Sequence, residues 1–228
     1  MSGAPAWEDD VLLDLVMDVA WDEAPGGDGS SGEGPRERAG AYEALSRLLK
    51  TQRSGDAVRW TEFDTPFGPM YVAATGRGLA RVSWQQEREA AFLEELERRW
   101  PDRPVIHDAA ALAEARGQME GYFRGERERF DLPVDLADLP PFQRDVLEAV
   151  RRVPFGDVVP YAELARRIRR PQAHRAVGNA LGRNPVAIVV PCHRVVRSDG
   201  SLGGYGGGVE YKKRLLRIEG RADLLRTG

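Results

Sequence analysis

Three kinds of residue pattern are scarce in this sequence, and each absence excludes a class of protein. The chain holds a single Cys in 228 residues, which excludes an internal disulfide and a metal centre built from its own thiolates. Its three His residues, His107, His174 and His193, are far apart. Because no Cys-x-x-Cys or His-x-x-x-His spacing occurs, we expect no metal site. No apolar run approaches the roughly 18 residues that a membrane-spanning helix needs, so no membrane partner is expected.

Basic residues are missing from the start of the chain. The first nine charged residues are acidic, and the first basic residue is Arg36. A secretory signal begins with basic residues, and an unpaired thiol fits a reducing compartment, so we expect a cytoplasmic protein. Residues 1–57 are interpreted as an acidic appendage without visible chemistry. Its short amphipathic helices, over 7–21 and 36–50, flank a Gly/Ser-rich flexible linker.

Charge is distributed unevenly along the rest of the chain. From Leu139 to the end there are 17 Lys and Arg against 8 Asp and Glu, whereas the preceding part holds 16 basic and 28 acidic residues. A basic segment favours a polyanionic partner, and nucleic acid is the commonest one. A solvated helix surface explains the charge equally well when charge is the only clue.

Residues 58–136 have the pattern of a small α+β domain. Short runs rich in aromatic and β-branched residues predict three strands, which lie at 59–64, 69–74 and 79–84. Turn sequences that end in Gly68 and Gly78 separate them. Two segments with helical spacing follow, at 88–100 and 109–123. The expected fold is therefore α+β, with a small three-stranded antiparallel sheet and helices, followed by a helical C-terminal domain over 137–228.

The C-terminal domain begins with short amphipathic helices. Phe142, Val146, Leu147 and Val150 give one apolar stripe. Helices predicted over 161–168 and 172–182 are joined by a tight turn, and within a basic segment such a pair is typical of a helix-turn-helix. The pattern is weak by itself, because many helical domains contain a similar corner.

The single cysteine, Cys192, follows the apolar run 186–190 and precedes His193 and Arg194. Free Cys is often a small buried hydrophobe, but an imidazole and a guanidinium beside it form the electropositive setting that favours a reactive thiolate. His193 is the candidate base, and Glu219 is the candidate that orients its ring. These residues make Cys192 a candidate nucleophile held on rigid structure.

Glycines cluster around Tyr205, at positions 203–208. The cluster does not fit a dinucleotide-binding loop, because no βαβ unit surrounds it and no acidic residue follows at the required distance. Glycines also allow a ligand to approach the backbone closely. We therefore expect this segment to line a pocket in which Tyr205 stacks on a flat group.

Taken together, these residues form a recognisable set. Its members are Phe142-Gln143, Val153-Pro154-Phe155-Gly156, Tyr161, Arg175-Ala176-Val177-Gly178, Asn184-Pro185, Pro191-Cys192-His193-Arg194-Val195-Val196, Gly203-Gly204-Tyr205 and Glu219-Gly220. With this set the chain resembles the O6-alkylguanine-DNA alkyltransferases, also called methylated-DNA–protein-cysteine methyltransferases. The resemblance covers about residues 58–225 and is most specific from Phe142 onward.

The resemblance implies a mode of DNA binding. The helix-turn-helix would enter the minor groove of double-stranded DNA, and the damaged guanine would be flipped out of the stack to reach the thiol. Arg175 would fill the vacated place in the duplex, and Tyr161 would rotate the phosphate and contact the base. Ala176 and Gly178 are small, so their helix would lie close to the groove floor. The appendage 1–57 is then hypothesised to fold against this basic face and compete with DNA.

The resemblance also implies the chemistry. Cys192 would take the alkyl group from O6 in one irreversible turnover, without a cofactor, and the protein would act as a monomer. His193 would act through a water molecule with Glu219 behind it, and Asn184 would fix the turn before an active-site strand. The expected substrate pocket is lined by Tyr161, Val195, Tyr205 and Gly206.

Several alternatives stay open from the sequence. A lesion-binding relative would have Trp in place of Cys192, a cysteine hydrolase would turn over, and a transcriptional regulator would recognise a specific DNA sequence. Gly206 replaces the Ala or Ser often found in the family, so the accepted size of alkyl group is open. The choice between O6-alkylguanine and O4-alkylthymine is open as well.

Overall fold

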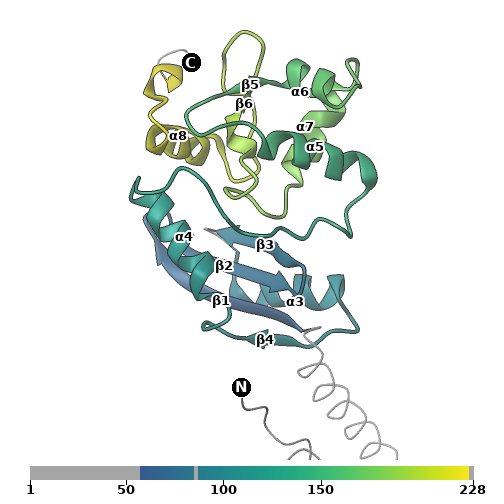
Figure 1. The fold of residues 1–228 in the computed structure, drawn as a ribbon, viewed down its shortest axis with the longest axis vertical. Coiled ribbons are helices and arrows are strands. Elements are labelled where there is room, and N and C mark those ends of the chain that lie inside the picture. The colour runs from purple at the N-terminus through teal and green to yellow at the C-terminus, as the bar shows by residue number, and fades with distance from the viewer. Residues whose placement is uncertain (1–56, 85–86, 226–228) are drawn as a thin grey trace, which may run out of the picture. The chain divides into compact units, whose positions relative to one another are not determined.

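The computed structural model describes residues 57–84 and 87–225, and the helices predicted for the appendage lie outside them. Within this part of the chain a four-stranded sheet with two helices is followed by short helices in the C-terminal region (Figure 1). This confirms the α+β class. None of the helices in the described ranges has the length and apolar character needed to cross a membrane.

The sheet is built mainly from consecutive antiparallel strands. β1 (Val58–Thr65), β2 (Gly68–Thr75) and β3 (Gly78–Trp84) confirm the three predicted strands. The three predicted antiparallel strands are joined by a fourth strand that was not predicted, β4 (Val105–His107), which pairs in parallel with β1, so the order is β3-β2-β1-β4. Three residues are too few for an alternating pattern to be visible in the sequence.

Each of the two hairpin turns ends in a glycine, and the backbone conformation there explains why. Gly68 and Gly78 have φ angles of 100° and 131°, which favour glycine. Gly78 is also crowded, because a side chain there would collide with the Pro133 carbonyl. The Thr65 hydroxyl accepts a hydrogen bond from the Phe67 amide at 3.1 Å, which closes the first turn.

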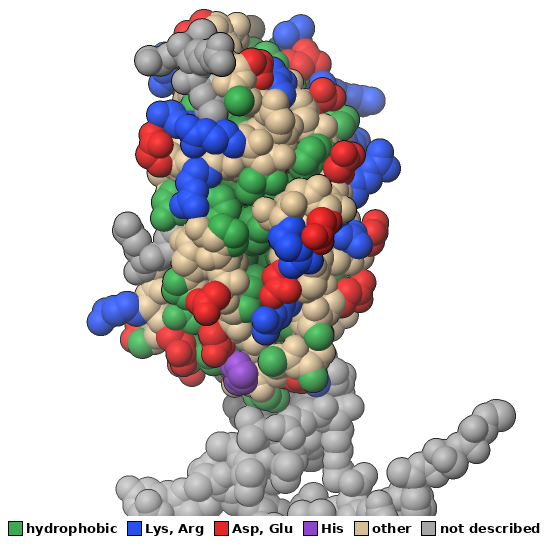
Figure 2. Space-filling model, turned by 90° about the vertical axis from the view of Figure 1, so that its left-hand side faces the viewer, with side chains coloured by type: hydrophobic (Ala, Val, Ile, Leu, Met, Phe, Trp, Pro, Cys, Tyr) green, Lys and Arg blue, Asp and Glu red, His purple; other side chains and the backbone are tan. Residues whose placement is uncertain are grey.

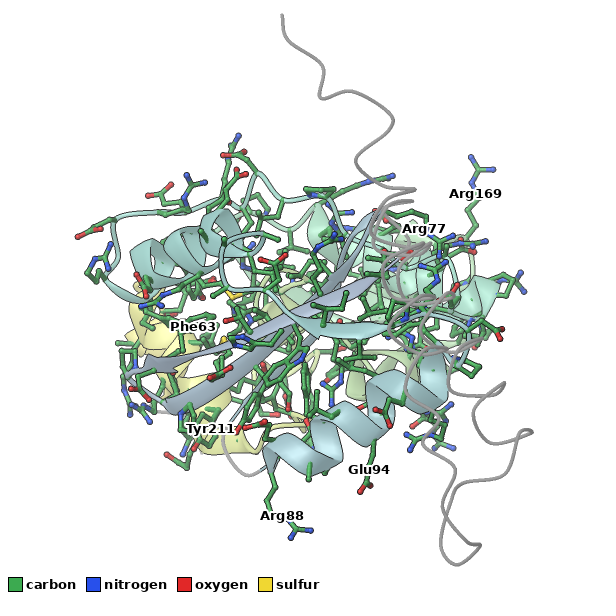
Figure 3. The ribbon with its side chains drawn as sticks, turned by 90° about the horizontal axis from the view of Figure 1, so that it is seen from below. Phe63, Arg77, Arg88, Glu94, Arg169 and Tyr211 are labelled. Atoms are coloured by element: carbon green, nitrogen blue, oxygen red, sulfur yellow. The ribbon has the colours of Figure 1, made fainter. Side chains whose placement is uncertain are left out.

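One helix packs on each face of the sheet. The helix α3 (Glu89–Arg99) buries Phe92 and Leu96 against Trp60 in a small apolar cluster. The helix α4 (Ala113–Phe123) contributes Met119 and Tyr122 to a larger cluster that also contains core residues of the C-terminal region. Both parts therefore share one hydrophobic core. Viewed from below, Arg88 at the N-terminus of α3 and Glu94 within α3 point away from the sheet (Figure 3).

The C-terminal region consists of short elements packed around the rest of this core. They are α5 (Pro141–Arg151), β5 (Val159–Pro160), α6 (Tyr161–Arg167), α7 (His174–Gly182), the 3-10 helix η1 (Cys192–Arg194), β6 (Val195–Val196), α8 (Val209–Ile218) and η2 (Ala222–Leu225). Val146, Leu147 and Val150 of the predicted stripe are fully buried. The pair β5 and β6 is parallel and places the end of η1 beside the start of α6.

The helices α6 and α7 form the predicted helix-turn-helix. Arg169 in the turn has a φ of 58°, and its side chain extends away from the body of the molecule (Figure 3). Leu164 and Val177 are fully buried and anchor the two helices on the core. The opposite side of α7 stays exposed, including Arg175 and Ala176.

The edge strand β3 connects the sheet to the segment before Cys192. The Val82 amide donates to the Pro185 carbonyl at 2.7 Å, and Val82 forms an isolated bridge with Val186. This pairing protects a sheet edge that would otherwise be open. Beyond it, the run 186–190 is a turn rather than the expected active-site strand, because the Val190 amide donates back to Val186 O and Ile188 has a φ of 77°.

Candidate active site

Cys192 begins the 3-10 helix η1 and is held by the side chain of Asn184. The Asn184 Nδ2 donates to the Val190 carbonyl at 2.8 Å and to the Cys192 Sγ at 3.2 Å. Its Oδ1 accepts from the Val186 amide at 3.0 Å. One amide group therefore fixes both ends of the turn and the position of the sulfur. The Cys192 residue is 7% exposed.

The protonation of the thiol differs from the expectation. Burial raises the pKa of the Cys192 thiol, and the hydrogen bond from Asn184 and the charge of Lys212 oppose that rise only in part. Arg194, predicted to be a nearby cation, instead donates to Glu219 and to the Val153 carbonyl. Adjacency in sequence was misleading here, because the tight 3-10 turn directs the Arg194 side chain into its own buried ion pair. The resting sulfur is a neutral thiol.

Lys212 of α8 is the cation near the thiol, and the sequence analysis did not identify it. Its side chain is fully buried, and its ammonium donates to the carbonyls of Val195 and Leu202. Burial lowers the pKa of Lys212 to about 8. A signal was available, because Lys212 shares the spacing i, i+3, i+4 with the buried Leu215 and Leu216. A Lys on the apolar face of a helix indicates a buried charge with a specific task.

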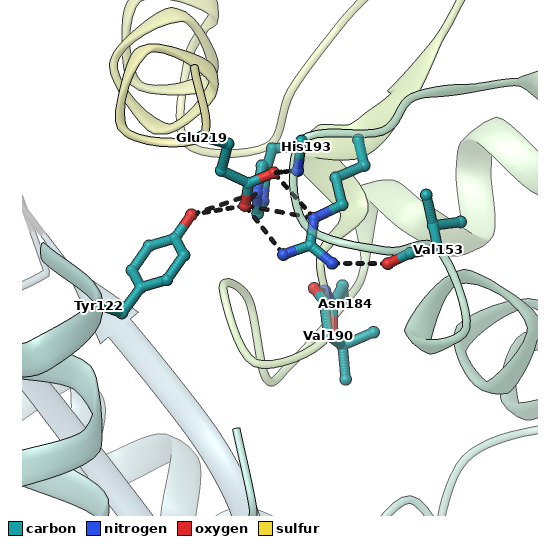
Figure 4. Close-up of polar contacts among 8 residues, drawn as sticks. Tyr122, Val153, Asn184, Val190, His193 and Glu219 are labelled. Atoms are coloured by element: carbon teal, nitrogen blue, oxygen red, sulfur yellow. Dashed lines mark hydrogen bonds and ion pairs between the residues drawn. The ribbon is translucent and has the colours of Figure 1, made fainter. Parts of the chain in front are cut away.

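His193 and Glu219 form the predicted pair. The His193 Nε2 lies 2.8 Å from the Glu219 Oε1, and both side chains are completely buried (Figure 4). Burial lowers the pKa of His193, so its ring is neutral. Burial opposes ionisation of Glu219, yet hydrogen bonds from His193 and Arg194 lower its pKa to about 2. Since an ionised carboxylate only accepts, Nε2 carries the ring proton. The other nitrogen, Nδ1, has no hydrogen-bond partner among the described residues.

The N-terminal region supplies a further residue to this pair. Tyr122 at the end of α4 is fully buried, and its hydroxyl donates to the Glu219 Oε1 at 2.8 Å (Figure 4). The same oxygen accepts from Arg194 Nη2 at 2.9 Å. Glu219 is therefore held from both halves of the described chain. No pattern in the sequence indicates this contact, which joins positions 97 residues apart.

A hollow of about 300 Å³ opens beside the sulfur; we call it the proximal pocket. Tyr161, Gly178, Tyr205 and Gly206 line it together with Cys192, so three of the four predicted pocket residues are brought together. Val195 does not line it, since it is fully buried and its carbonyl is bound by Lys212. The remaining lining residues are Leu181, Gly182 and Gly204.

The proximal pocket is bordered by groups that stay protonated. Burial raises the pKa of Tyr161, and burial raises the pKa of Tyr205 strongly. The Tyr161 hydroxyl donates to Gly204 O at 3.4 Å, a long bond. Tyr161 thus presents a neutral hydroxyl at the mouth of the pocket, available as a donor to a ligand.

The face outside this mouth is basic. Arg175 and Arg197 line a shallow hollow of about 360 Å³ next to Tyr161, Gly178 and Gly203. Arg175 is exposed and makes no hydrogen bond or ion pair with any residue in the described ranges. On the face drawn in Figure 2, acidic side chains gather over the lower, sheet-bearing part, while Lys and Arg are prominent higher up. An anionic partner is therefore favoured at the C-terminal region.

No group of three metal-ligating side chains occurs within the described residues. The chemistry of the site rests on a thiol, a neutral imidazole with a free nitrogen, a buried carboxylate and a basic face. A neutral thiol next to an open pocket can be deprotonated as it attacks an electrophilic carbon.

Two family models match this chain. The 6-O-methylguanine DNA methyltransferase ribonuclease-like domain matches residues 58–136, and the DNA-binding domain of the same enzyme matches residues 141–221. The chain belongs to the 6-O-methylguanine DNA methyltransferase family. The predicted family is confirmed.

Relatives and solved structures agree with this assignment. The chain is 37% identical over 158 residues to the methylated-DNA–protein-cysteine methyltransferase of Methanosarcina acetivorans, covering 69% of this chain and 96% of that protein. It is 40% identical over 152 residues to the inducible enzyme of Bacillus subtilis, covering 67% and 84%. Mycobacterium tuberculosis OGT in complex with DNA superimposes with a TM-score of 0.61 at 36% identity, covering 72% of this chain and 94% of that one.

Proposed function

We propose that this protein is a methylated-DNA–protein-cysteine methyltransferase that repairs O6-alkylguanine in double-stranded DNA by moving the alkyl group onto its own Cys192. The observation that carries the proposal is the arrangement around the sulfur. The chain's single thiol faces a pocket next to a basic helix-turn-helix, with the buried His193–Glu219 pair behind it. Family membership supports the same activity.

His193 is the group that takes the proton from the thiol. Its Nε2–H is directed at Glu219, which leaves the lone pair of Nδ1 as the acceptor. A water molecule between Nδ1 and Sγ relays the proton. Because the resting thiol is neutral, deprotonation accompanies attack, and Glu219 stabilises the imidazolium while it exists. Asn184 and Lys212 stabilise the developing thiolate.

The transfer is a direct displacement. The Cys192 sulfur attacks the carbon bound to O6, the S–C bond forms as the C–O6 bond breaks, and the electron pair of that bond goes to the guanine. The proton lost by the thiol returns to the base, so guanine leaves neutral. The Tyr161 hydroxyl and the Gly206 amide stabilise the leaving base. The thioether has no neighbouring group that can hydrolyse it, so each molecule acts once and needs no cofactor.

The lesion reaches the sulfur by leaving the duplex. Helix α7 enters the minor groove, and the flipped base occupies the proximal pocket. Flipping is needed because the thiol cannot reach the O6 substituent while the base is stacked in the duplex. Arg175 fills the gap that the base leaves, a use of an inserted side chain that minor-groove proteins share. Ala176 and Gly178 are small and let the helix approach closely. Tyr161 contacts the phosphate and the base.

The protein acts as a monomer, because one chain supplies every group named above. A reduced thiol is required, which favours the cytoplasm.

The test is to incubate the protein with a duplex that carries one O6-methylguanine and to weigh the protein afterwards. We expect Cys192 to exchange its proton for one methyl group stoichiometrically, and Cys192→Ala to gain none while melting at a similar temperature. Continued turnover with release of product would instead indicate a cysteine hydrolase. Tight binding of the lesion without any gain in mass would indicate a binding protein.

A further inference from the structure

One arginine of the helix-turn-helix is held in a backbone conformation that favours glycine. Arg169 follows the end of helix α6 and has a φ of 58°. Its amide donates to the Arg166 carbonyl at 2.9 Å, and the next amide, of Arg170, donates to the Ala165 carbonyl at 2.8 Å. These two hydrogen bonds form a Schellman motif, in which the left-handed position is usually glycine. An arginine at this position therefore costs stability that a glycine would not.

No contact among the described residues offsets the strain at Arg169. Its side chain is exposed and extends away from the body of the molecule (Figure 3). Within the described part of the chain, its guanidinium forms no hydrogen bond or ion pair, and the same is true of Arg170. By contrast, Arg166 and Arg167 both pair with Glu163. A strained residue that does not support the fold points to a function outside it.

The turn that carries Arg169 lies at the same end of α7 as Arg175. The Ala173 amide donates to the Arg170 carbonyl at 2.9 Å, and α7 begins at the next residue, His174. Between positions 161 and 175 the sequence has five Arg and only one acidic residue. The turn therefore extends the basic face beyond α7.

The dimensions of DNA indicate what this part of the face would meet. The minor groove of the duplex is about 6 Å wide, whereas a helix with its side chains is about 10–12 Å across. If α7 enters the groove, the turn that precedes it stays outside and lies against the phosphates along the edge of the groove. A guanidinium binds phosphate well, because two of its N–H groups can donate in parallel to two phosphate oxygens.

We propose that Arg169, with Arg170 beside it, binds a phosphate of the DNA backbone at the edge of the groove that α7 enters. This inference rests on the proposed function and deepens it. It adds a contact away from the flipped nucleotide, and this contact depends neither on the lesion nor on the base sequence. The left-handed conformation directs the Arg169 side chain outward, so the protein loses some stability at this turn and gains affinity for DNA.

The experiment uses the full chain and measures its melting temperature and its affinity for an undamaged duplex at several salt concentrations. Arg169→Gly removes both the charge and the strain. We expect the melting temperature to rise by about 2–4 °C and the affinity to fall by about 3- to 10-fold. The slope of log affinity against log salt concentration should decrease in size by about 1.

Two further variants separate charge from strain. Arg169→Lys keeps both, so its melting temperature and salt slope should stay close to those of the wild type. Arg88→Ala, which removes an exposed arginine from the sheet region, controls for the change in net charge and should leave the salt slope unchanged. Alkylation of Cys192 by free O6-benzylguanine should stay within about twofold in all three variants.

The outcomes distinguish this inference from the proposed function. A higher melting temperature of Arg169→Gly with unchanged affinity and salt slope would overturn the phosphate contact, and the proposed function would remain. An equal loss of salt slope in Arg169→Lys and Arg169→Gly would also overturn it, because the charge would then not be the cause. If the wild type bound no duplex and gained no methyl group from a methylated one, the proposed function itself would fail.

Discussion

The sheet region, residues 57–136, and the helical region, residues 137–225, contribute to the site in different ways. The helical region supplies the thiol, the imidazole, the carboxylate and the basic face, all within short segments that are visible in the sequence. The sheet region supplies Tyr122 behind Glu219, and its paired Arg81 and Glu95 line a hollow that also reaches Cys192. Its contribution becomes visible only when the chain is folded. The reacting groups thus come from segments close together in the sequence, whereas the residues that support and surround them come from distant parts of the chain.

This difference has a physical origin. A nucleophile and its base must be held with small tolerance, and closely spaced residues on a short turn achieve this with few long-range contacts. The carboxylate behind them is costly to bury, and it needs more donors than one segment can offer. Glu219 therefore receives hydrogen bonds from η1 and from α4, on the two sides of the shared core. Substitutions at Glu219 and at Tyr122 should therefore measure how strongly the helical region depends on this support.

The largest effect is expected for Glu219→Gln. Removing the charge leaves the buried Arg194 without its carboxylate, and breaking a buried pair in this way costs about 3–5 kcal/mol. We expect a corresponding drop in the free energy of unfolding in urea, together with slow alkyl transfer because the His193 ring loses its orientation. The control is Glu210→Gln on the exposed side of α8, where Glu210 pairs with Lys213 and the melting temperature should not change. Equal stability of wild type and Glu219→Gln would show that the network is not supporting the fold.

Lowering the pH should remove the stabilisation that the ionised Glu219 gives to the folded protein. The folded pKa of Glu219 is about 2 against an ordinary value of 4.5. Since the folded pKa is the lower one, the stabilisation is fully present above about pH 4.5 and is lost as pH falls toward 2. The shift corresponds to roughly 3 kcal/mol. The difference in unfolding free energy between wild type and Glu219→Gln should therefore shrink steadily from pH 5 to the lowest pH at which both fold, and a constant difference would contradict the assigned shift.

Much of this organisation could be predicted from the sequence, but not all of it. The three long strands and the helix-turn-helix follow from periodicity and turn residues, and the His193–Glu219 pair was a candidate taken from the base and orienting group that a thiol nucleophile needs. The strand β4 is too short to show a period, and the turn at 186–190 was interpreted as a strand because its apolar run looks the same in either conformation. Long-range pairings such as Tyr122 with Glu219 leave no signal in one sequence.

The protonation state of the thiol was the most instructive error. Arg194 lies next to Cys192 only along the chain, while Lys212, which shares its surroundings, is 20 residues away. Burial then outweighs both Lys212 and Asn184 and raises the thiol pKa. Neighbours in sequence define the charge of a segment, but only the fold defines which charge a buried atom meets.

An intermediate effect is expected at the DNA face, for Arg175→Ala. Arg175 is exposed and forms no hydrogen bond or ion pair within the described residues, so its loss should leave stability unchanged. The rate of transfer from duplex O6-methylguanine should fall by about 10- to 100-fold, because the flipped state loses an inserted side chain that contributes a few kcal/mol. The rate of transfer from free O6-benzylguanine should change by less than about twofold. Arg88→Ala at the start of α3 is the matched control in the sheet region and should alter neither reaction. An equal loss on both substrates would contradict the role of Arg175 in the duplex.

The smallest effect is expected for Tyr122→Phe, which tests directly how the sheet region supports the reacting groups of the helical region. The ring stays in its aromatic surroundings beside Phe123 and Phe130. The change removes the hydroxyl, and with it the hydrogen bond to Glu219 and the longer 3.4 Å contact with His193 Nε2, at a cost of about 1 kcal/mol. We expect a few-fold slower alkylation of Cys192 and a changed pH profile, because Glu219 holds the His193 ring less firmly. Tyr71→Phe, on the other side of the sheet, should change neither quantity. If Tyr122→Phe lowered stability but left the pH profile of transfer untouched, the sheet region would support the fold of the site without reaching its chemistry.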